Sequence, residues 1–267
     1  MKKFMIRCDM EGVSGITGYE QAIPGGSEYG TGRKYFMSDL LAAVKGLTEG
    51  KADEIHIYDE HCDGRNIDLS VLGGNVKVYC GKPPYTEAWA GGLDESFNGL
   101  ILLGFHSKRG TENAILNHTY ESDIKDITVN GRSVGEIGIE TYIAGHFSVP
   151  LLMITGDSEG VKEAHDIVPQ ATGVTVKESL SEHGAVCYPL SKTSQLIYEA
   201  AKRSAKAEDI SDPLSIRGIV KMKITFFDTP YAVQYRKLFG VPVFEEDNIL
   251  ICWARYWQNK LKVQKTI

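Results

Sequence analysis

Two carboxylates stand close together near the start of the chain. Asp9 and Glu11 occur in the sequence DMEG, directly after a short apolar run at residues 4–8. Because side chains alternate along an extended chain, both carboxylates point to one side, and Gly12 then permits a sharp turn. Such a pair can bind a hard or borderline cation. The alternative is an Asp that caps a turn and a solvated Glu.

Histidines follow two further apolar runs. Residues 54–58 lead into YDEHCDGRN, which contains His61, and residues 100–103 lead into GFH, which ends at His106. A single histidine is usually structural or merely exposed, but the same pattern at three strand ends is much less expected by chance. Zinc readily takes imidazole nitrogen and carboxylate oxygen as ligands. The sequence therefore indicates a metal site built at several strand ends.

Glu136 and His118 complete the set of candidate residues. Glu136 lies in VGEIGIETY, at the start of a helix predicted over residues 135–147. A carboxylate there can simply stabilise the helix dipole, by roughly 0.3–1 kcal/mol, but the flanking Gly135 and Gly138 would let a bulky group approach the backbone. Five side chains would supply enough ligands for two ions: Asp9, Glu11, His61, His106 and Glu136. His118, in LNHTYE, would remain free to act on protons or on an oxyanion.

The elements that must position these residues follow an α/β order. Strands are predicted at residues 4–8, 54–58, 76–80, 100–103 and 151–155, and helices at 34–47, 135–147 and 159–168. Alternation of strand and helix predicts a mostly parallel sheet flanked by helices, in which ligands gather at the carboxyl ends of the strands. Loops without periodicity at residues 9–33, 59–66 and 106–113 follow predicted strands and can converge on one cleft.

The last third of the chain predicts a smaller unit. A helix from about Ser191 leads to Asp212-Pro213, which we interpret as a hinge. Beyond it we predict a strand at 220–226, a helix at 231–238, a strand at 248–252 and a terminal helical stretch. The predicted division is therefore a metal-binding catalytic α/β domain over residues 1–190 and a smaller α/β unit over residues 191–267.

Composition excludes several classes of function. The net charge of −6 disfavours a nucleic-acid partner, which would require a concentrated positive field. The five cysteines are widely spaced without a C-x-x-C pair, which fits a reducing compartment. No run approaches the roughly 18 apolar residues of a membrane helix, and acidic residues from position 9 come too early for the apolar core of a signal peptide. We expect a cytoplasmic protein with no membrane partner.

The motifs taken in order resemble a known family. DMEG, DEH, GFH, NH, NGRSVGEIGIETY and GD, from residue 1 to about 170, are similar to the M55 metallopeptidases, typified by the bacterial D-aminopeptidase of dipeptide transport operons. The resemblance weakens through the last third. Carried over by position, it implies that Asp9 bridges two zinc ions and that His118 is the catalytic histidine. It assigns the other ligands as follows: Glu11 and His61 to the first ion, His106 and Glu136 to the second. It also implies a homo-oligomer, a decameric ring whose central channel admits only short peptides.

The chain departs from the family pattern around two of these residues. Glu60 stands where the typical enzyme has a small hydroxyl residue, Cys62 and Asp63 follow the histidine of that motif, and Asn117 precedes His118. These changes concern the metal preference and the substrate more than the mechanism.

A competing motif is G-x-S-x-G at residues 156–160, between a predicted strand and a predicted helix. It would make Ser158 the nucleophile of a serine hydrolase. His183 is then the only plausible base, because His165 lies on the same predicted helix. No HGGG-like segment precedes the motif, and this interpretation leaves the metal-site residues without a role. The plainer interpretation is that Ser158, beside Asp157, is a helix N-cap.

The favoured function is a binuclear zinc aminopeptidase that releases the N-terminal residue of short peptides with a metal-activated water. A binuclear phosphoesterase could use the same ligands, with Arg65, Lys108 or Arg132 holding phosphate. A non-catalytic metal-binding module is a third possibility, and the spare imidazole of His118 argues against it. The preference for a D-residue follows from the resemblance alone, because the peptide carbonyl has no handedness. The walls that would select it are expected in residues 16–33 and 63–69.

Overall fold

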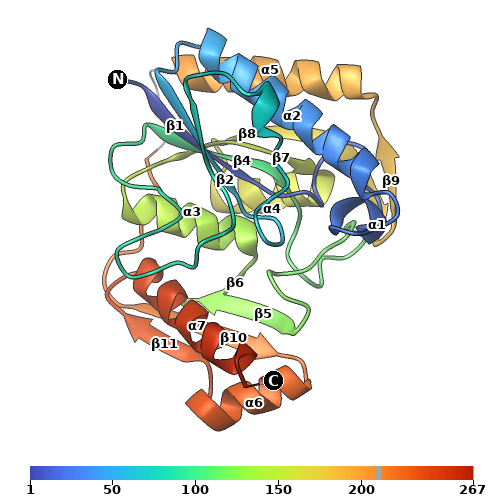
Figure 1. Ribbon diagram of the computed structural model, residues 1–267. Helices are drawn as coiled ribbons and strands as arrows, with labels where there is room; N and C mark the ends of the chain where they lie inside the picture. The colour runs from blue at the N-terminus through green and yellow to red at the C-terminus, as the bar shows by residue number, and fades with distance from the viewer. Residues whose placement is uncertain (208–211, 267) are drawn as a thin grey trace.

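The computed structural model describes residues 1–207 and 212–266 and contains a seven-stranded sheet (Figure 1). In spatial order its strands are β3 (Val76–Tyr79), β2 (Glu54–Asp59), β1 (Lys3–Cys8), β4 (Gly99–Phe105), β7 (Leu151–Asp157), β8 (Thr172–Ser181) and β9 (Gly184–Cys187). Every pair is parallel except β8 with β9. The prediction of a mostly parallel α/β sheet is therefore confirmed, although β8 and β9 of this sheet were not predicted.

Helices cover both faces of this sheet (Figure 1). On one face lie α2 (Tyr29–Glu49) and α5 (Leu190–Lys206), which pack against each other, and on the other lie α3 (Glu136–His146) and α4 (Ser158–Ile167). The central strands β1, β4 and β7 are buried along their whole length, as expected for strands covered on both sides. Two short helical segments, α1 (Tyr19–Ala22) and η1 (Leu69–Val71), interrupt the loops.

A second, four-stranded antiparallel sheet lies beside α3, at the bottom of Figure 1. Its strands, in spatial order, are β11 (Val243–Glu246), β10 (Val220–Phe226), β5 (Ile124–Val129) and β6 (Arg132–Val134), and the helices α6 (Pro230–Phe239) and α7 (Ile249–Gln264) accompany them. This sheet takes β5 and β6 from before residue 190, whereas α5, after that residue, packs on α2. The small sheet thus combines segments from both sides of the predicted boundary. The predicted hinge at Asp212-Pro213 borders residues 208–211, which lie outside the described ranges.

The strand predicted at residues 248–252 is wrong. Asn248 is the N-cap of α7, and its side-chain oxygen accepts a hydrogen bond from the backbone N–H of Ile251 at 3.0 Å. The apolar run that follows is compatible with a buried strand or a buried helix, and the capping residue decides for the helix. The strand in this region is β11, which ends at Glu246.

Strand register brings the carboxyl ends of β1, β2 and β4 together. Cys8, the last residue of β1, pairs with Asp59 of β2 on one side and with Leu103 of β4 on the other. The loop after β1 then packs directly on the end of β4: a Cβ atom at Gly12 would lie 1.9 Å from the carbonyl oxygen of Phe105. This position therefore requires glycine. Within the described ranges, no helix is long and apolar enough to cross a membrane.

Candidate metal centre

The first group of possible metal ligands consists of Asp9, Glu11 and His61, from the ends of β1 and β2. Their ligand atoms all lie within 4.8 Å of one another. His61 Nδ1 is 2.9 Å from Asp9 Oδ1 and 3.1 Å from Glu11 Oε2. All three residues are at most 4% exposed. The structure therefore brings together the residues that the sequence placed after two separate strands.

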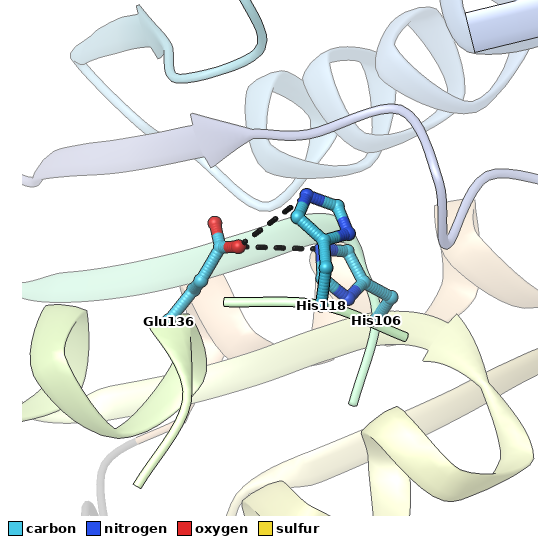
Figure 2. A group of neighbouring side chains, drawn as sticks. All are labelled: His106, His118 and Glu136. Carbon is cyan, nitrogen blue, oxygen red and sulfur yellow. Dashed lines mark ion pairs between the residues drawn. The ribbon is translucent and has the colours of Figure 1, made fainter. Parts of the chain in front are cut away.

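The second group consists of His106, His118 and Glu136 (Figure 2). Glu136 Oε1 lies 3.4 Å from His106 Nε2 and 3.8 Å from His118 Nε2. The two imidazole rings are stacked, with centroids 4.2 Å apart. His106 follows β4, His118 lies in the loop between β4 and β5, and Glu136 opens α3.

Asp9 connects the two groups. Its Oδ1 faces His61, and its Oδ2 lies 3.3 Å from Nε2 of His106. A carboxylate that offers one oxygen to each side is the usual bridge in a two-metal site.

Each of the three histidines directs one ring nitrogen at a backbone carbonyl. These contacts are His61 Nε2 to Ala22 O (2.9 Å), His106 Nδ1 to Ser107 O (2.8 Å) and His118 Nδ1 to Leu116 O (3.0 Å). A carbonyl oxygen can only accept, so that nitrogen carries the hydrogen and the other nitrogen of a neutral ring offers a lone pair. In all three cases the other nitrogen faces a carboxylate of the site. Metal-binding histidines in proteins are oriented in this way.

Burial and charge act against each other at these groups. Burial alone would raise the pKa of Asp9, but the adjacent imidazoles of His106 and His61 hold that pKa well below its ordinary value. Burial alone would lower the pKa of His106, but Asp9 and Glu136 raise it well above its ordinary value. The pKa of Glu136 is also lowered, by His106 beside it. Asp9 and Glu136 are therefore ionised and require positive charge beside them, which protons on the imidazoles or bound cations can provide.

Three buried atoms of the site lack a hydrogen-bond partner among the described residues. They are Asp9 Oδ2, Glu11 Oε2 and His106 Nε2. A buried polar atom without a partner is costly, and all three atoms belong to the candidate ligand set. The oxygen and imidazole donors thus fit one or more divalent cations of the zinc type.

The site opens into a cavity of about 310 Å³. All six predicted site residues except His106 line it, and His106 lies behind Asp9 and Glu136. Tyr19 and Ile23 also line it, as the prediction for residues 16–33 requires, whereas the predicted wall at residues 63–69 does not contribute.

A network beside the site was missed from the sequence. Arg7, in the middle of buried β1, forms an ion pair with Glu140 and lies 3.5 Å from Glu60, and all three are at most 4% exposed. Tyr85 donates a hydrogen bond to Glu60 at 2.9 Å. Arg7 therefore supplies positive charge beside Glu60, the residue that departs from the family pattern. The sequence feature that could have indicated this network is Arg7 itself, a charged residue within the apolar run KFMIRC.

Partly buried polar contacts also hold the second group in place. Tyr120 donates its backbone N–H to Glu136 at 2.7 Å. The carboxylate of Glu163 accepts from the backbone N–H groups of Lys108 and Gly135, at 2.7 and 3.2 Å. Glu163 therefore joins the segment after His106 to the segment before Glu136. The sequence did not indicate this role, because Glu163 has the pattern of an ordinary polar residue on the outer face of a predicted helix.

The serine-hydrolase interpretation finds no support in this geometry. Asp157, and not Ser158 as predicted, is the N-cap of α4, because the Asp157 carboxylate accepts from the N–H groups of the following turn. The Ser158 hydroxyl accepts a hydrogen bond from the backbone N–H of Ser179 at 3.0 Å. Over residues 1–207 and 212–266, no histidine hydrogen bonds to Ser158, and Ser158 does not line the cavity.

The basic residues considered for a phosphoesterase also lie elsewhere. Arg65 faces Asp63 at the surface, Lys108 donates to Ser133, and Arg132 donates to the carbonyl of Asp166. None of these three basic side chains lines the cavity.

Comparison with known proteins gives the family. The model of the M55 peptidase family, described as D-aminopeptidase, matches residues 1–259. The chain belongs to this family. A D-aminopeptidase of Bacillus subtilis (strain 168) is 26% identical over 220 residues, which cover 80% of this chain and 77% of that protein. The chain is thus a peptide hydrolase of the aminopeptidase type, and the resemblance noted in its motifs is confirmed.

A solved structure extends the likeness to the whole fold. It is described as the Zn-dependent D-aminopeptidase DppA from Bacillus subtilis, a self-compartmentalizing protease, and superposes with a TM-score of 0.88 at 24% identity. The match covers 98% of this chain and 97% of that one. The shared fold therefore includes the last third of the chain, where the sequence motifs weaken.

Proposed function

We propose that this M55 family member releases the N-terminal residue of short peptides with two zinc ions, one at each group of candidate ligands. The observation that carries the proposal is the position of Asp9, which offers one carboxylate oxygen to each group. Glu11 and His61 would complete the first ion's protein ligands, and His106 and Glu136 the second's. Imidazole and carboxylate donors suit zinc, and the structural relative is described as Zn-dependent.

Two bound divalent ions would supply an acidified water and polarise the scissile carbonyl. The side chains of the protein would do the rest. His118 is the most accessible of the three histidines, with a side chain 19% exposed and lining the cavity. The carbonyl of Leu116 fixes the hydrogen on Nδ1, so Nε2 would accept a proton from the attacking water and deliver it to the leaving amine. Asp9 and Glu136, whose pKa values the neighbouring imidazoles already lower, would remain ionised beside the cations.

Further properties are proposed from the relatives' names. We propose that the released residue is a D-amino acid, because both relatives are described as D-aminopeptidases. The self-compartmentalizing character of the structural relative supports a homo-oligomer, for which we propose a decameric ring with the active sites facing an inner space. All five cysteines are free, which supports a cytoplasmic location. A monomer by light scattering at working concentration would contradict the ring.

Metal titration with activity tests the proposed function. Protein stripped with chelator is titrated with zinc, and bound zinc per chain is measured beside hydrolysis of D-alanyl p-nitroanilide. We expect two ions per chain and activity that depends on them. Full activity without metal, or hydrolysis of p-nitrophenyl phosphate in place of the anilide, would refute the proposal. Matched D- and L-alanyl dipeptides on the same loaded protein then test handedness: a clear L preference would remove the D-specific assignment alone.

A further inference from the structure

A buried lysine contacts the loop that follows β1. Lys177, in β8, has an exposed fraction of 0%. Its ammonium group donates hydrogen bonds to three backbone carbonyls of that loop: Glu11 O (2.5 Å), Val13 O (2.9 Å) and Ile16 O (2.5 Å). An ammonium group has three N–H donors, so the loop uses all of them.

The contact is long-range and requires a particular path of the chain. In the sheet, β4 and β7 separate β1 from β8. The loop after β1 must therefore cross the ends of both strands to reach Lys177. Along this path the N–H of Gly12 bonds the carbonyl of Gly104 at 2.8 Å, and Gly12 packs against Phe105 without room for a side chain.

A second buried charge holds the same loop. Asp39 of α2 is also 0% exposed and accepts hydrogen bonds from the backbone N–H and the hydroxyl of Ser14, at 3.0 and 2.9 Å. Within the described ranges, Lys177 forms no ion pair with Asp39 or any other carboxylate. The partners of the buried Lys177 are therefore backbone carbonyls. Burying an ammonium group is costly, and an apolar side chain would fill the same core position.

We propose that Lys177 is a positioning residue for the metal centre, which holds the loop in the one path that presents Glu11 to the first ion. This inference rests on the proposed two-ion function. Glu11 is held at both ends: its carbonyl bonds Lys177, and its carboxylate faces His61 at 3.1 Å. Without Lys177, three buried carbonyls lose their donor, and the loop must move to find another. Glu11 moves with it, whereas Glu136 and His106 lie on other segments.

Zinc binding to the Lys177→Met variant tests the proposal directly. Wild type and variant are stripped with chelator, and zinc content and the two dissociation constants are measured by competition with a chromophoric chelator. We expect the variant to keep the ion at His106 and Glu136 and to bind the other 10- to 100-fold more weakly, the usual cost of removing a supporting contact from a metal site. Activity should return as free zinc rises, because the ligands themselves remain. Two ions bound with unchanged affinity by the folded variant would overturn the proposal.

The matched control is Lys3→Met. Lys3 is another buried lysine, 9% exposed, but it donates to Ser96 near the amino end of β1, away from the site. A similar selective loss of one ion in this variant would show a general effect of lysine burial and would also overturn the proposal. If Lys177→Met does not fold, Lys177→Arg replaces it: a planar guanidinium cannot reproduce the three bonds, so weakened binding of one ion is again expected and unchanged binding contradicts the role. Fewer than two ions in the wild type would instead refute the two-ion function.

Discussion

The two groups of candidate ligands differ in how the chain builds them. The first group comes from the ends of two neighbouring parallel strands, and its members are almost completely buried. The second draws on a strand end, a loop and a helix start, and His118, in its loop, is the most exposed of the six residues. Three non-glycine residues of that loop have positive φ: Asn113, Leu116 and Tyr120. The buried first group is suited to holding an ion, and the more accessible second group is suited to transferring protons.

Each group also depends on an anchoring residue outside it, fully buried for the first group and partly buried for the second. Lys177 and Asp39 hold the loop of the first group, and Glu163 ties together the two segments of the second. The anchors lie on elements that contribute no ligand, namely β8, α2 and α4. The geometry of the site is therefore set by the packed layers around it as much as by the strand ends.

The largest effect is expected where the two groups meet. Asp9→Asn removes the charge that both ions would share, so we expect loss of both ions and a fall in kcat/KM of roughly 10⁴-fold or more, since the acidified water disappears with them. Zinc content per chain and hydrolysis of D-alanyl p-nitroanilide measure it. Asp94→Asn, at a half-exposed carboxylate that pairs with Lys3, is the control. A variant that keeps both ions would exclude Asp9 as the bridge.

The next effect separates roles within the second group. His118→Ala should keep two ions and lower kcat by about 10²- to 10⁴-fold, the usual contribution of a general acid or base. His106→Ala should instead lose one ion. His118 Nε2 is close enough to Glu136 to be a ligand itself, so metal content decides. If His118→Ala loses an ion and His106→Ala does not, the two roles are exchanged.

The sequence predicted the first group better than the second for a physical reason. Asp9, Glu11 and His61 follow strands whose apolar runs are visible, and the ends of parallel strands meet at one edge. The position of His118 depends on a loop without periodicity; the sequence offered it as a spare imidazole, and the family resemblance gave it the catalytic role. The antiparallel strand β6 was missed because it has only three residues, and β5 was missed because its partly exposed sequence IKDITV has no continuous apolar run. The start of α7 shows the same limit of sequence analysis, because the capping residue Asn248, and not the apolar run after it, determines that this segment is a helix.

A smaller effect concerns the anchor of the first group. Burial raises the pKa of Asp39 to about 6, and the hydrogen bonds from Ser14 only partly oppose it. The folded protein therefore holds this proton more tightly than the unfolded chain, whose Asp has a pKa near 3.9. The resulting stabilisation is complete below about pH 4 and is lost as the pH rises through 6.

Urea unfolding of metal-free protein measures this effect. The free energy of unfolding of the wild type, relative to Asp39→Asn, should fall by about 2–3 kcal/mol between pH 4 and pH 6.5, because each unit of pKa difference corresponds to about 1.4 kcal/mol. Asp39→Asn has no charge to titrate at this position. A difference between the two proteins that does not change with pH would show that Asp39 is not the titrating anchor.

The smallest effect is expected just outside both groups, at the end of β7. Ser158 lies at a strand end of the same sheet, yet its hydroxyl forms one hydrogen bond with the described residues, accepted from the backbone N–H of Ser179. The capping contacts at the start of α4 come from Asp157. Ser158→Ala should therefore cost about 0.5–1.5 kcal/mol of stability, the usual net contribution of one hydrogen bond, and leave kcat/KM within about twofold of wild type. Thermal unfolding and hydrolysis of the same anilide measure the two quantities on one preparation. Full loss of turnover in a folded variant that retains both ions would make Ser158 the nucleophile and would remove the catalytic role from both ligand groups. Retained turnover would instead leave the chemistry at the cavity that the two ligand groups line, with Asp9 shared between the groups.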